Sequence, residues 1–428
     1  MKNSWKSVNL FDFLIKAMLL FLPFTWALTI NIGFPFKFSE LFLISILTMI
    51  FLIGRVAVPK IGEFKYLGVF VGAILISLVV NFFWSYDYTL SEVSGRFGSK
   101  FDSLLKFVYI ILATLTFVMV VKAVTRSGPD QYVKFWLYGA FVSALYAFYI
   151  FTFSLFDLSP TMLPGHEPQY QSIFIFRVIR NGTFKEGNYM GLYLLISSII
   201  AHQVNRKLMY YFLTAAIITT VSTASIFGAI MFLVLKNLSY LLSKFTLNKL
   251  AILFVFVAAV GFGGWSLSDN VYVEKYFVSK FVGSLTKMSS GTDKSRVERT
   301  NLTIVASKIF ASNPIFGVGI SSFSTHYDQY NENNQFEYRD FKIIPNNVYL
   351  EVLSEAGLIA FLFWIGFMLS LIKRAKELSR TSYYWGLITI FLSLIAFPTF
   401  SMLFIWAFFG LLVGTSENRK ISTSPQLF

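Results

Sequence analysis

Three polar segments between residues 177 and 357 carry arginine and glutamate at spacings that suit chemistry on a negatively charged group. The first contains Arg177 and Arg180 and runs through Gly187 and Asn188 into an apolar stretch. Gly187 and Asn188 predict a turn and a helix cap. An arginine beside a helix N-terminus presents a planar donor fork next to free amides, which favours a phosphate or diphosphate. The alternative interpretation is a solvated loop with an ordinary cap.

The second segment combines two arginines with a short amphipathic helix. Arg296 and Arg299 stand at its beginning. Three apolar residues recur at helical spacing and predict one buried face: Leu302, Val305 and Ile309. Such a helix would lie on a membrane or pack against a helix bundle. Its arginines would then contact a bound anion or, in the alternative interpretation, lipid head groups.

The helical pattern ends at Asn313 and Pro314 and passes into Phe-Gly-Val-Gly. Gly317 and Gly319 predict a tight apolar turn that another group approaches closely. His326 follows this turn and is one of three histidines in the chain. We therefore place these two glycines and His326 among the candidate substrate-binding residues.

The third segment predicts the start of a long apolar helix. Asn346 and Asn347 follow a proline and suit the first positions of that helix. Glu351 and Glu355 then lie one turn apart on one face. Carboxylates near the outer end of a membrane helix are costly, so we expect them to be functional and to pair with the arginines. The alternative is that both contact water in the interfacial zone.

The composition predicts what kind of structural elements hold these residues in place. The chain has 428 residues, of which 56% are hydrophobic and 14% are charged, whereas soluble domains carry about 25% charge. We count about 12 apolar runs long enough to cross a bilayer as helices. With no cysteine and three histidines, we expect no disulfide, no thiolate nucleophile, no metal site and no cofactor. The sequence thus predicts an all-α integral membrane protein.

The expected spans cover residues 11–30, 41–58, 67–84, 105–124, 133–155, 189–203, 208–221, 223–235, 250–267, 348–372, 384–397 and 399–413. The first run has no small-residue cleavage site and is followed by a second span, so we interpret it as an anchor. The pair that begins at residue 208 is either a tight hairpin or one long or broken helix.

The chain has a net charge of +14, and the distribution of its basic residues indicates how it is oriented in the membrane. Lysine and arginine gather in the short loops on one side, and this marks the cytoplasmic face. We therefore expect both termini in the cytoplasm and no nucleic-acid partner. Three regions follow: residues 1–268 with nine helices and an outer loop at 157–187, a large outer loop with an amphipathic helix at 269–345, and residues 346–428 with the last three helices and a cytoplasmic tail.

In order, the three segments resemble motifs of the O-antigen ligase and Wzy polymerase superfamily of membrane glycosyltransferases. Members carry Arg–Gly–aromatic–x–x–x–Asn entering a middle helix, which residues 180–188 match loosely. The interval from Arg180 to Gly191 also fits the Arg-x10-Gly spacing of Wzy polymerases. Arg299 stands at the family's distance before a Pro-Leu-x-Gly-x-Gly motif, here Pro-Ile-Phe-Gly-Val-Gly, with Arg296 as a near alternative.

The third family motif is His-Asn-x-x-Leu-x-x-x-x-Glu-x-Gly, and residues 346–357 fit it except at the first position. In ligases that histidine is thought to assist the acceptor hydroxyl, and here Asn346 replaces it. Asparagine can position a hydroxyl but cannot take its proton near neutral pH. A second departure is Ser225-Ile226, where the family commonly has Ser-Arg.

The resemblance implies a GT-C-like helical fold that transfers sugars at the periplasmic face of a bacterial inner membrane. The donor and the acceptor would be oligosaccharides linked to undecaprenyl diphosphate. Arg180 and Arg299, helped by Arg177 and Arg296, would hold the leaving diphosphate without a metal. Asn188 and Asn347 are further substrate-binding candidates. If a base is needed, the candidates are Glu351, Glu355 and His326, and the sequence does not choose among them.

Within the family, the missing histidine and the arginine-to-glycine spacing favour a repeat-unit polymerase, with a chain-length regulator protein as a further partner. The alternative is an O-antigen ligase that transfers the polymer to lipid A core. A polysaccharide transporter or flippase is the alternative from another class, since about twelve helices is common there too. We find no half-to-half repeat and no buried acidic ladder, which disfavours transport.

Overall fold

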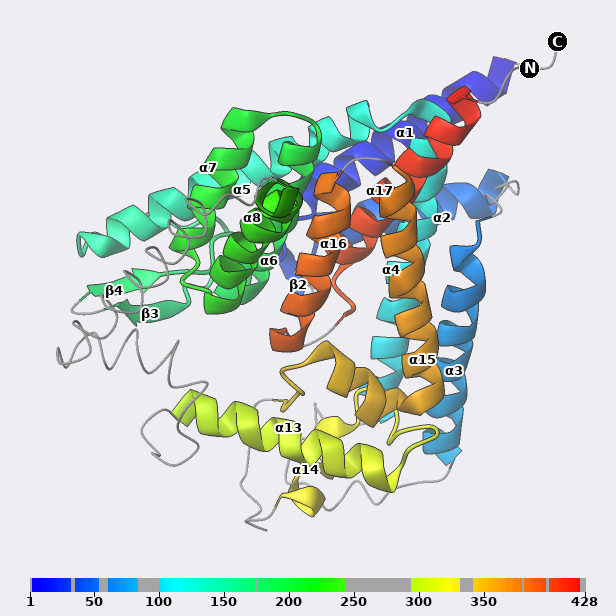
Figure 1. Ribbon diagram of the computed structural model, residues 1–428, viewed down its shortest axis with the longest axis vertical. Helices are drawn as coiled ribbons and strands as arrows, with labels where there is room; N and C mark the ends of the chain where they lie inside the picture. The colour runs from blue at the N-terminus through cyan, green and yellow to red at the C-terminus, as the bar shows by residue number, and fades with distance from the viewer. Residues whose placement is uncertain are drawn as a thin grey trace.

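The computed structural model describes residues 2–31, 35–53, 61–83, 100–173, 176–243, 294–331, 342–378, 381–397 and 400–423. These residues are mostly helical (Figure 1). Their strands form two short antiparallel hairpins, β1 (Ile30–Asn31) with β2 (Pro35–Phe36), and β3 (Tyr170–Ile173) with β4 (Phe176–Ile179). The expected all-α class is therefore confirmed in its main part.

The helices before residue 244 are α1 (Lys2–Phe21), α2 (Phe38–Ile53), α3 (Glu63–Phe83), α4 (Lys100–Ser127), α5 (Asp130–Leu155), α6 (Gly187–Gln203), α7 (Lys207–Thr219) and α8 (Thr223–Ser243). Those after residue 293 are α13 (Lys294–Ser312), α14 (Phe323–Tyr330), α15 (Val348–Glu377), α16 (Thr381–Ser393), the short 3₁₀ helix η3 (Leu394–Ala396) and α17 (Leu403–Thr423).

Four segments of these helices are long and apolar enough to cross a membrane: Glu63–Val80, Asp102–Ser127, Asp130–Leu155 and Val348–Glu377. Shorter apolar segments are Phe38–Leu52, Lys207–Thr219, Thr223–Asn237 and Ser382–Ala396. This agrees with a membrane protein. The number of twelve spans and their orientation stay predictions. The expected span at 250–267 and most of the large loop lie outside the described residues.

The first expected span, residues 11–30, extends beyond the end of the helix. α1 ends at Phe21, and the chain turns before β1 begins at Ile30. Pro23 follows closely and cannot continue the helix. The backbone amides of Trp26 and Ala27 donate to the carbonyl oxygen of Thr183 instead. The end of this apolar run therefore packs against the loop before α6.

Two further expectations concern helix boundaries. α7 and α8 are separate helices joined at Val221, whose φ of 49° interrupts the helical path. A single continuous helix is therefore wrong, and the segment consists of two separate apolar helices, which suits either a hairpin or a broken helix. The last expected span, residues 399–413, begins and ends too early, because α17 begins at Leu403 and continues to Thr423.

Aromatic side chains form the core of the long-helix bundle. Trp364 on α15 packs against Trp406 on α17 and Phe70 on α3, with ring centroids 5.7 and 5.2 Å apart. Phe367 on α15 meets Phe117 on α4 in an edge-on contact at 5.6 Å. These rings interlock α3, α4, α15 and α17, which run side by side. The bundle thereby supplies a rigid support for the polar end of α15.

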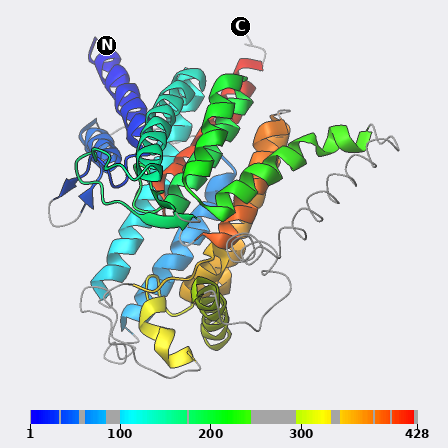
Figure 2. The ribbon, with the colours of Figure 1, turned by 90° about the vertical axis from the view of Figure 1, so that its left-hand side faces the viewer.

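α13 and α14 lie at the end of the molecule opposite both chain termini (Figures 1 and 2). They enclose a second, small core that contains Leu302, Val305 and Ile309 together with Phe323 and Tyr327. The predicted buried face of α13 is confirmed. This face packs on α14 and α15. Contacts within the protein therefore hold α13 against the bundle.

Candidate functional site

The site is built around a break in α15. Gly357 interrupts the helix with a φ of 79°, a region that favours glycine. The loop after α13 fits into this break: the amides of Val318 and Gly319 donate to the carbonyl oxygens of Ser354 and Glu355, each at 2.9 Å. The amide of Leu358 donates back to Pro314 at 2.8 Å. These bonds replace those that the helix loses.

The glycines of the Phe-Gly-Val-Gly turn permit this contact. A Cβ on Gly317 would lie 2.4 Å from the backbone carbon of Glu355, and one on Gly357 would lie 2.1 Å from the carbonyl oxygen of Ile315. The expected close approach is therefore present. The group that approaches Gly317 is the backbone of α15.

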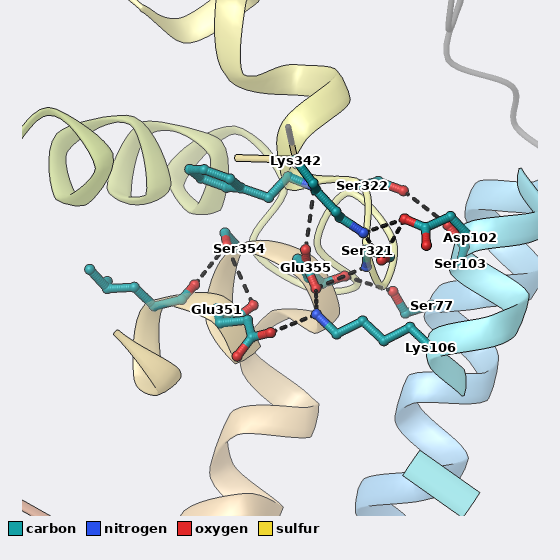
Figure 3. Close-up of polar contacts among 12 residues, drawn as sticks. Ser77, Asp102, Ser103, Lys106, Ser321, Ser322, Lys342, Glu351, Ser354 and Glu355 are labelled. Atoms are coloured by element: carbon teal, nitrogen blue, oxygen red, sulfur yellow. Dashed lines mark hydrogen bonds and ion pairs between the residues drawn. The ribbon is translucent and has the colours of Figure 1, made fainter. Parts of the chain in front are cut away.

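Glu355 is buried beside the break and fully engaged. One carboxylate oxygen accepts the amide of Ser321 at 2.9 Å and the ammonium of Lys106 at 2.8 Å. The other oxygen accepts the amide of Phe323 at 3.3 Å. Glu355 therefore holds the turn before α14 against α15 and α4 (Figure 3). The interpretation in which it contacts water in an interfacial zone is wrong, because its side chain is 0% exposed.

Glu351 lies one turn earlier and has a different environment. Its Oε1 accepts Lys106 Nζ at 2.6 Å, and its side chain is 1% exposed. Its Oε2 is buried and has no hydrogen-bond partner among the residues that the structure describes. Both glutamates thus pair with a lysine of α4 (Figure 3). The sequence had suggested the arginines as their partners, and this was wrong.

A polar cluster surrounds these three residues. Asp102 accepts hydrogen bonds from Lys342 and from the hydroxyl of Ser321, the latter at 3.1 Å. Ser77 on α3 donates to the carbonyl oxygens of Phe316 and Glu355, at 2.5 and 3.0 Å. α4 and the segment leading into α15 therefore anchor the turn at Ser321, and α3 anchors the loop at Phe316 (Figure 3).

The first turn of α15 is capped as the sequence predicted. The Asn347 side chain accepts hydrogen bonds from the amides of Tyr349 and Leu350, at 2.9 and 3.3 Å. Asn346 stands just outside the helix and is half-buried. Asn347 thus has a structural role, and Asn346 directly precedes this cap.

Arg180 follows directly after β4 and is oriented by neighbouring amide side chains. Its Nη1 donates to Oε1 of Gln171 at 3.2 Å, and its Nη2 donates to Oδ1 of Asn188 at 2.9 Å. Its Nε is buried without a partner among the described residues. A Cβ on Gly187 would lie 2.5 Å from that Nε, so glycine leaves room for the guanidinium at the beginning of α6.

Asn188 is not the helix cap that the sequence suggested. α6 begins at Gly187, and the preceding Glu186 makes no side-chain capping bond. Asn188 lies inside the first turn, and its side-chain oxygen binds Arg180 instead. The amide of Gly187 is satisfied by the side chain of Gln169 at 2.8 Å. Asn188 is therefore placed to orient Arg180.

Arg180 and Arg299 are close enough for their charges to interact. Burial lowers the pKa of Arg180; the charge of Glu186 raises this pKa, and the charge of Arg299 lowers it. Neither arginine has a carboxylate within salt-bridge distance in the described part of the chain. Glu186 offsets part of the repulsion on Arg180, and Arg299 is exposed.

Electrostatic interactions link the start of α6 to Arg180 and to Glu351. Tyr189, in the first turn of α6, interacts electrostatically with both Glu186 and Glu351. Glu186 also acts on Arg180. Tyr189 at the start of α6 is therefore within electrostatic range of Glu351 in the first turn of α15.

Three remaining candidates are placed less directly. Arg177 is exposed, and its guanidinium stacks over the Tyr170 ring at 4.2 Å. The side chain of Arg296 lies outside the described residues. His326 is buried on α14, where its Nδ1 lies 2.9 Å from the carbonyl oxygen of Ser322. Burial lowers the pKa of His326, opposed by this hydrogen bond and by the charge of Glu355, so its imidazole is neutral near pH 7.

The most important residue that the sequence interpretation missed is Lys106. It stands in an otherwise apolar run of α4, and an ionisable residue inside such a run is a functional candidate by itself. Gln171 and Asp102 were missed as well. The role of Asp102 depends on contacts with distant segments, and that of Gln171 depends on the β3–β4 hairpin, which brings it next to Arg180.

Comparison with known proteins adds the family. Residues 208–365 match the family model Wzy_C, described as O-antigen ligase. The match begins in α7 and ends within α15, so it contains Arg299 and the motif at 346–357, whereas Arg180 precedes it. No curated protein matches the chain. The resemblance to the O-antigen ligase and Wzy superfamily is thereby confirmed.

Proposed function

We propose that this chain, whose residues 208–365 carry the O-antigen ligase domain, is a membrane glycosyltransferase that polymerises polyprenyl-diphosphate-linked oligosaccharide repeat units. Its place would be the periplasmic face of a bacterial inner membrane, with undecaprenyl diphosphate as the carrier and a chain-length regulator as a partner. One observation carries the proposal most directly. Arg180 and Arg299 interact as like charges and have no carboxylate partner among the described residues.

The reaction places specific demands on such a site. The bond between the anomeric carbon and the phosphate oxygen breaks, and its electron pair leaves with the diphosphate. A glycosidic bond forms to the acceptor hydroxyl oxygen, which loses its proton. Two guanidinium groups can hold the growing negative charge without a metal. Because diphosphate is a good leaving group, positioning and charge stabilisation would supply much of the acceleration.

The choice of polymerase over ligase rests on Asn346, which stands where the ligase pattern has histidine. Asn346 precedes the helix that carries Glu351 and Glu355. A side-chain amide there can orient a sugar hydroxyl. In a polymerase this hydroxyl belongs to a second lipid-linked oligosaccharide, and in a ligase it belongs to lipid A core.

Deleting the gene in its host and separating the surface polysaccharide on a gel tests this function. Loss of the polymer ladder, with single repeat units left on the carrier or the core, is the expected result. Complementation with wild type should restore the ladder, and the Arg180→Ala protein should not. Uncapped core together with long polymer on the carrier would identify a ligase. An unchanged ladder would contradict both activities.

A further inference from the structure

Lys106 brings a positive charge into the polar end of the bundle. It projects from α4 and contacts Glu351 at 2.6 Å and Glu355 at 2.8 Å. The three side chains are 13%, 1% and 0% exposed. Charge pairs this deeply buried are screened weakly, so the position of the ammonium group fixes both carboxylates (Figure 3).

The two carboxylates have different numbers of partners. Glu355 receives two backbone amides as well as Lys106, and each of its oxygens accepts at least one hydrogen bond. Glu351 receives Lys106 on Oε1, while its Oε2 has no partner in the described part of the chain. Glu355 is thus a structural anchor. Glu351 keeps one oxygen for a donor from outside the protein.

The charges of the three residues agree with these different roles of Glu355 and Glu351. Two carboxylates and one ammonium leave a single net negative charge. The amides of Ser321 and Phe323 stabilise the share on Glu355. Glu351 Oε2 has no donor among the described residues, and a buried acceptor without a donor is costly. A hydroxyl group would satisfy this oxygen.

The position of Glu351 suits the acceptor. It lies in the first turn of α15, after Asn346 and the capping Asn347. On its other side it interacts with Tyr189 at the start of α6, the helix whose N-terminus holds Arg180. An acceptor hydroxyl between Asn346 and Glu351 would therefore approach a donor whose diphosphate is bound by the arginine pair.

We propose that Glu351 Oε2 receives the acceptor hydroxyl and its proton, and that Lys106 is the positioning residue that holds Glu351 for this step. This rests on the glycosyltransferase function proposed above. The hydroxyl oxygen forms the glycosidic bond to the anomeric carbon, and the bond to the diphosphate breaks with its electron pair. The proton moves from the hydroxyl to Oε2. It then passes to solvent, so that Glu351 returns to its charged form.

The test measures turnover of purified full-length protein on a lipid-linked repeat unit, with donor KM and kcat determined separately. Glu351→Gln and Lys106→Met should each lower kcat by about tenfold to a hundredfold and leave the donor KM within about threefold. Lys106→Arg, which keeps the charge, should recover part of the rate. Lys122→Met, on the same helix but outside the cluster, is the matched control and should keep wild-type kcat.

The double variant separates positioning from simple structural support. If Lys106 acts through Glu351, Lys106→Met should cause little further loss in the Glu351→Gln background. Multiplying effects would show that Lys106 acts elsewhere and would overturn the proposal. Should Lys106→Met fold poorly, Lys106→Met with Glu355→Gln has the same net charge as the wild-type cluster. That variant should fold and still show reduced kcat.

The controls distinguish this inference from the underlying function. An active wild type with an inactive Arg180→Ala, together with wild-type kcat in the Glu351→Gln and Lys106→Met proteins, would overturn the assignment of Glu351 and Lys106 alone. A wild-type protein that binds the lipid-linked donor but never transfers it to a hydroxyl would overturn both.

Discussion

At the scale of residues, the charges at the polar end of the molecule fall into two groups. Lys106 and the two glutamates compensate one another within hydrogen-bond distance. Arg180 and Arg299 have no carboxylate at that distance among the described residues. Glu186 acts on Arg180 only at longer range. The two arginines are therefore the residues that we propose for anion binding.

Arg180→Lys should lower turnover by about tenfold to a hundredfold, because a lysine cannot contact Gln171 and Asn188 and still present a planar fork to a diphosphate. Initial rates on the lipid-linked repeat unit measure this effect. Arg206→Lys, at an exposed position before α7, is the control and should leave the rate unchanged. Full polymer from normally folded Arg180→Ala and Arg299→Ala proteins would refute the diphosphate assignment.

Asn346→Ala should cost about 1–3 kcal/mol of transition-state stabilisation, which is roughly tenfold to a hundredfold in rate. The reason is the loss of a hydrogen bond that orients the acceptor hydroxyl. Rates measured across the pH range of histidine titration should show no step that depends on this position. A complete loss of activity in Asn346→Ala, beside active Glu351→Gln and Glu355→Gln proteins, would reverse this order of importance.

At the scale of elements, the break in α15 determines where the site residues lie. The first part of α15 carries Glu351 and Glu355, and the loop after α13 fills the break at Gly357. α13 is thereby fixed to the bundle, and it carries Arg299. The helix that carries Arg299 and the helix that carries the two glutamates are thus joined through backbone hydrogen bonds.

Gly357→Ala should lower the free energy of unfolding by about 3 kcal/mol, since alanine is strained at this positive φ and its Cβ would meet the Ile315 carbonyl. Thermal unfolding of the purified protein measures the change. Gly72→Ala on α3 is the matched control, because a Cβ there meets nothing within 4 Å, and it should gain up to about 1 kcal/mol. Equal stability of the Gly357→Ala and wild-type proteins would contradict the role of the break.

Local patterns predicted the elements better than the contacts between them. The buried face of α13 and the cap at Asn347 follow from residue spacing and type, which are local properties. Lys106 and Glu351 are separated by 245 residues, and nothing in either neighbourhood identifies the partner. Asn188 was misassigned for a different reason, since its contact with the nearby Arg180 depends on how the loop between β4 and α6 folds.

The spacing from Arg180 to Gly191 is also explained by contacts that the sequence alone does not show. A Cβ on Gly191 would lie 2.3 Å from Ser225 Oγ, so this glycine serves the packing of α6 on α8. The spacing that resembles Wzy polymerases thus has a structural reason in this chain. Asn346 therefore carries more of the argument for a polymerase than the spacing does.

At the scale of the whole molecule, the ends of the chain and the site lie at opposite ends. α13 and α14 are far from both termini (Figures 1 and 2). This agrees with the expectation that the termini are cytoplasmic and the site is periplasmic, which stays a prediction.

Reporter fusions test this orientation. An alkaline phosphatase fused at Asn331 should be active, because this enzyme requires the periplasm, and one fused at Ser416 should be inactive. A reporter that works only in the cytoplasm should give the opposite pattern. Cytoplasmic activity at Asn331 would contradict the placement of the donor site and with it the proposed reaction.

The most direct test of the central claim uses purified protein and a single repeat unit on polyprenyl diphosphate, with no other acceptor. The wild-type protein should produce a ladder of longer glycans on the carrier, with diphosphate carrier released at each step, and Arg180→Ala should produce no ladder. Transfer that requires added lipid A core would identify a ligase instead. Unchanged single repeat units with both acceptors, from folded wild-type protein, would contradict the account.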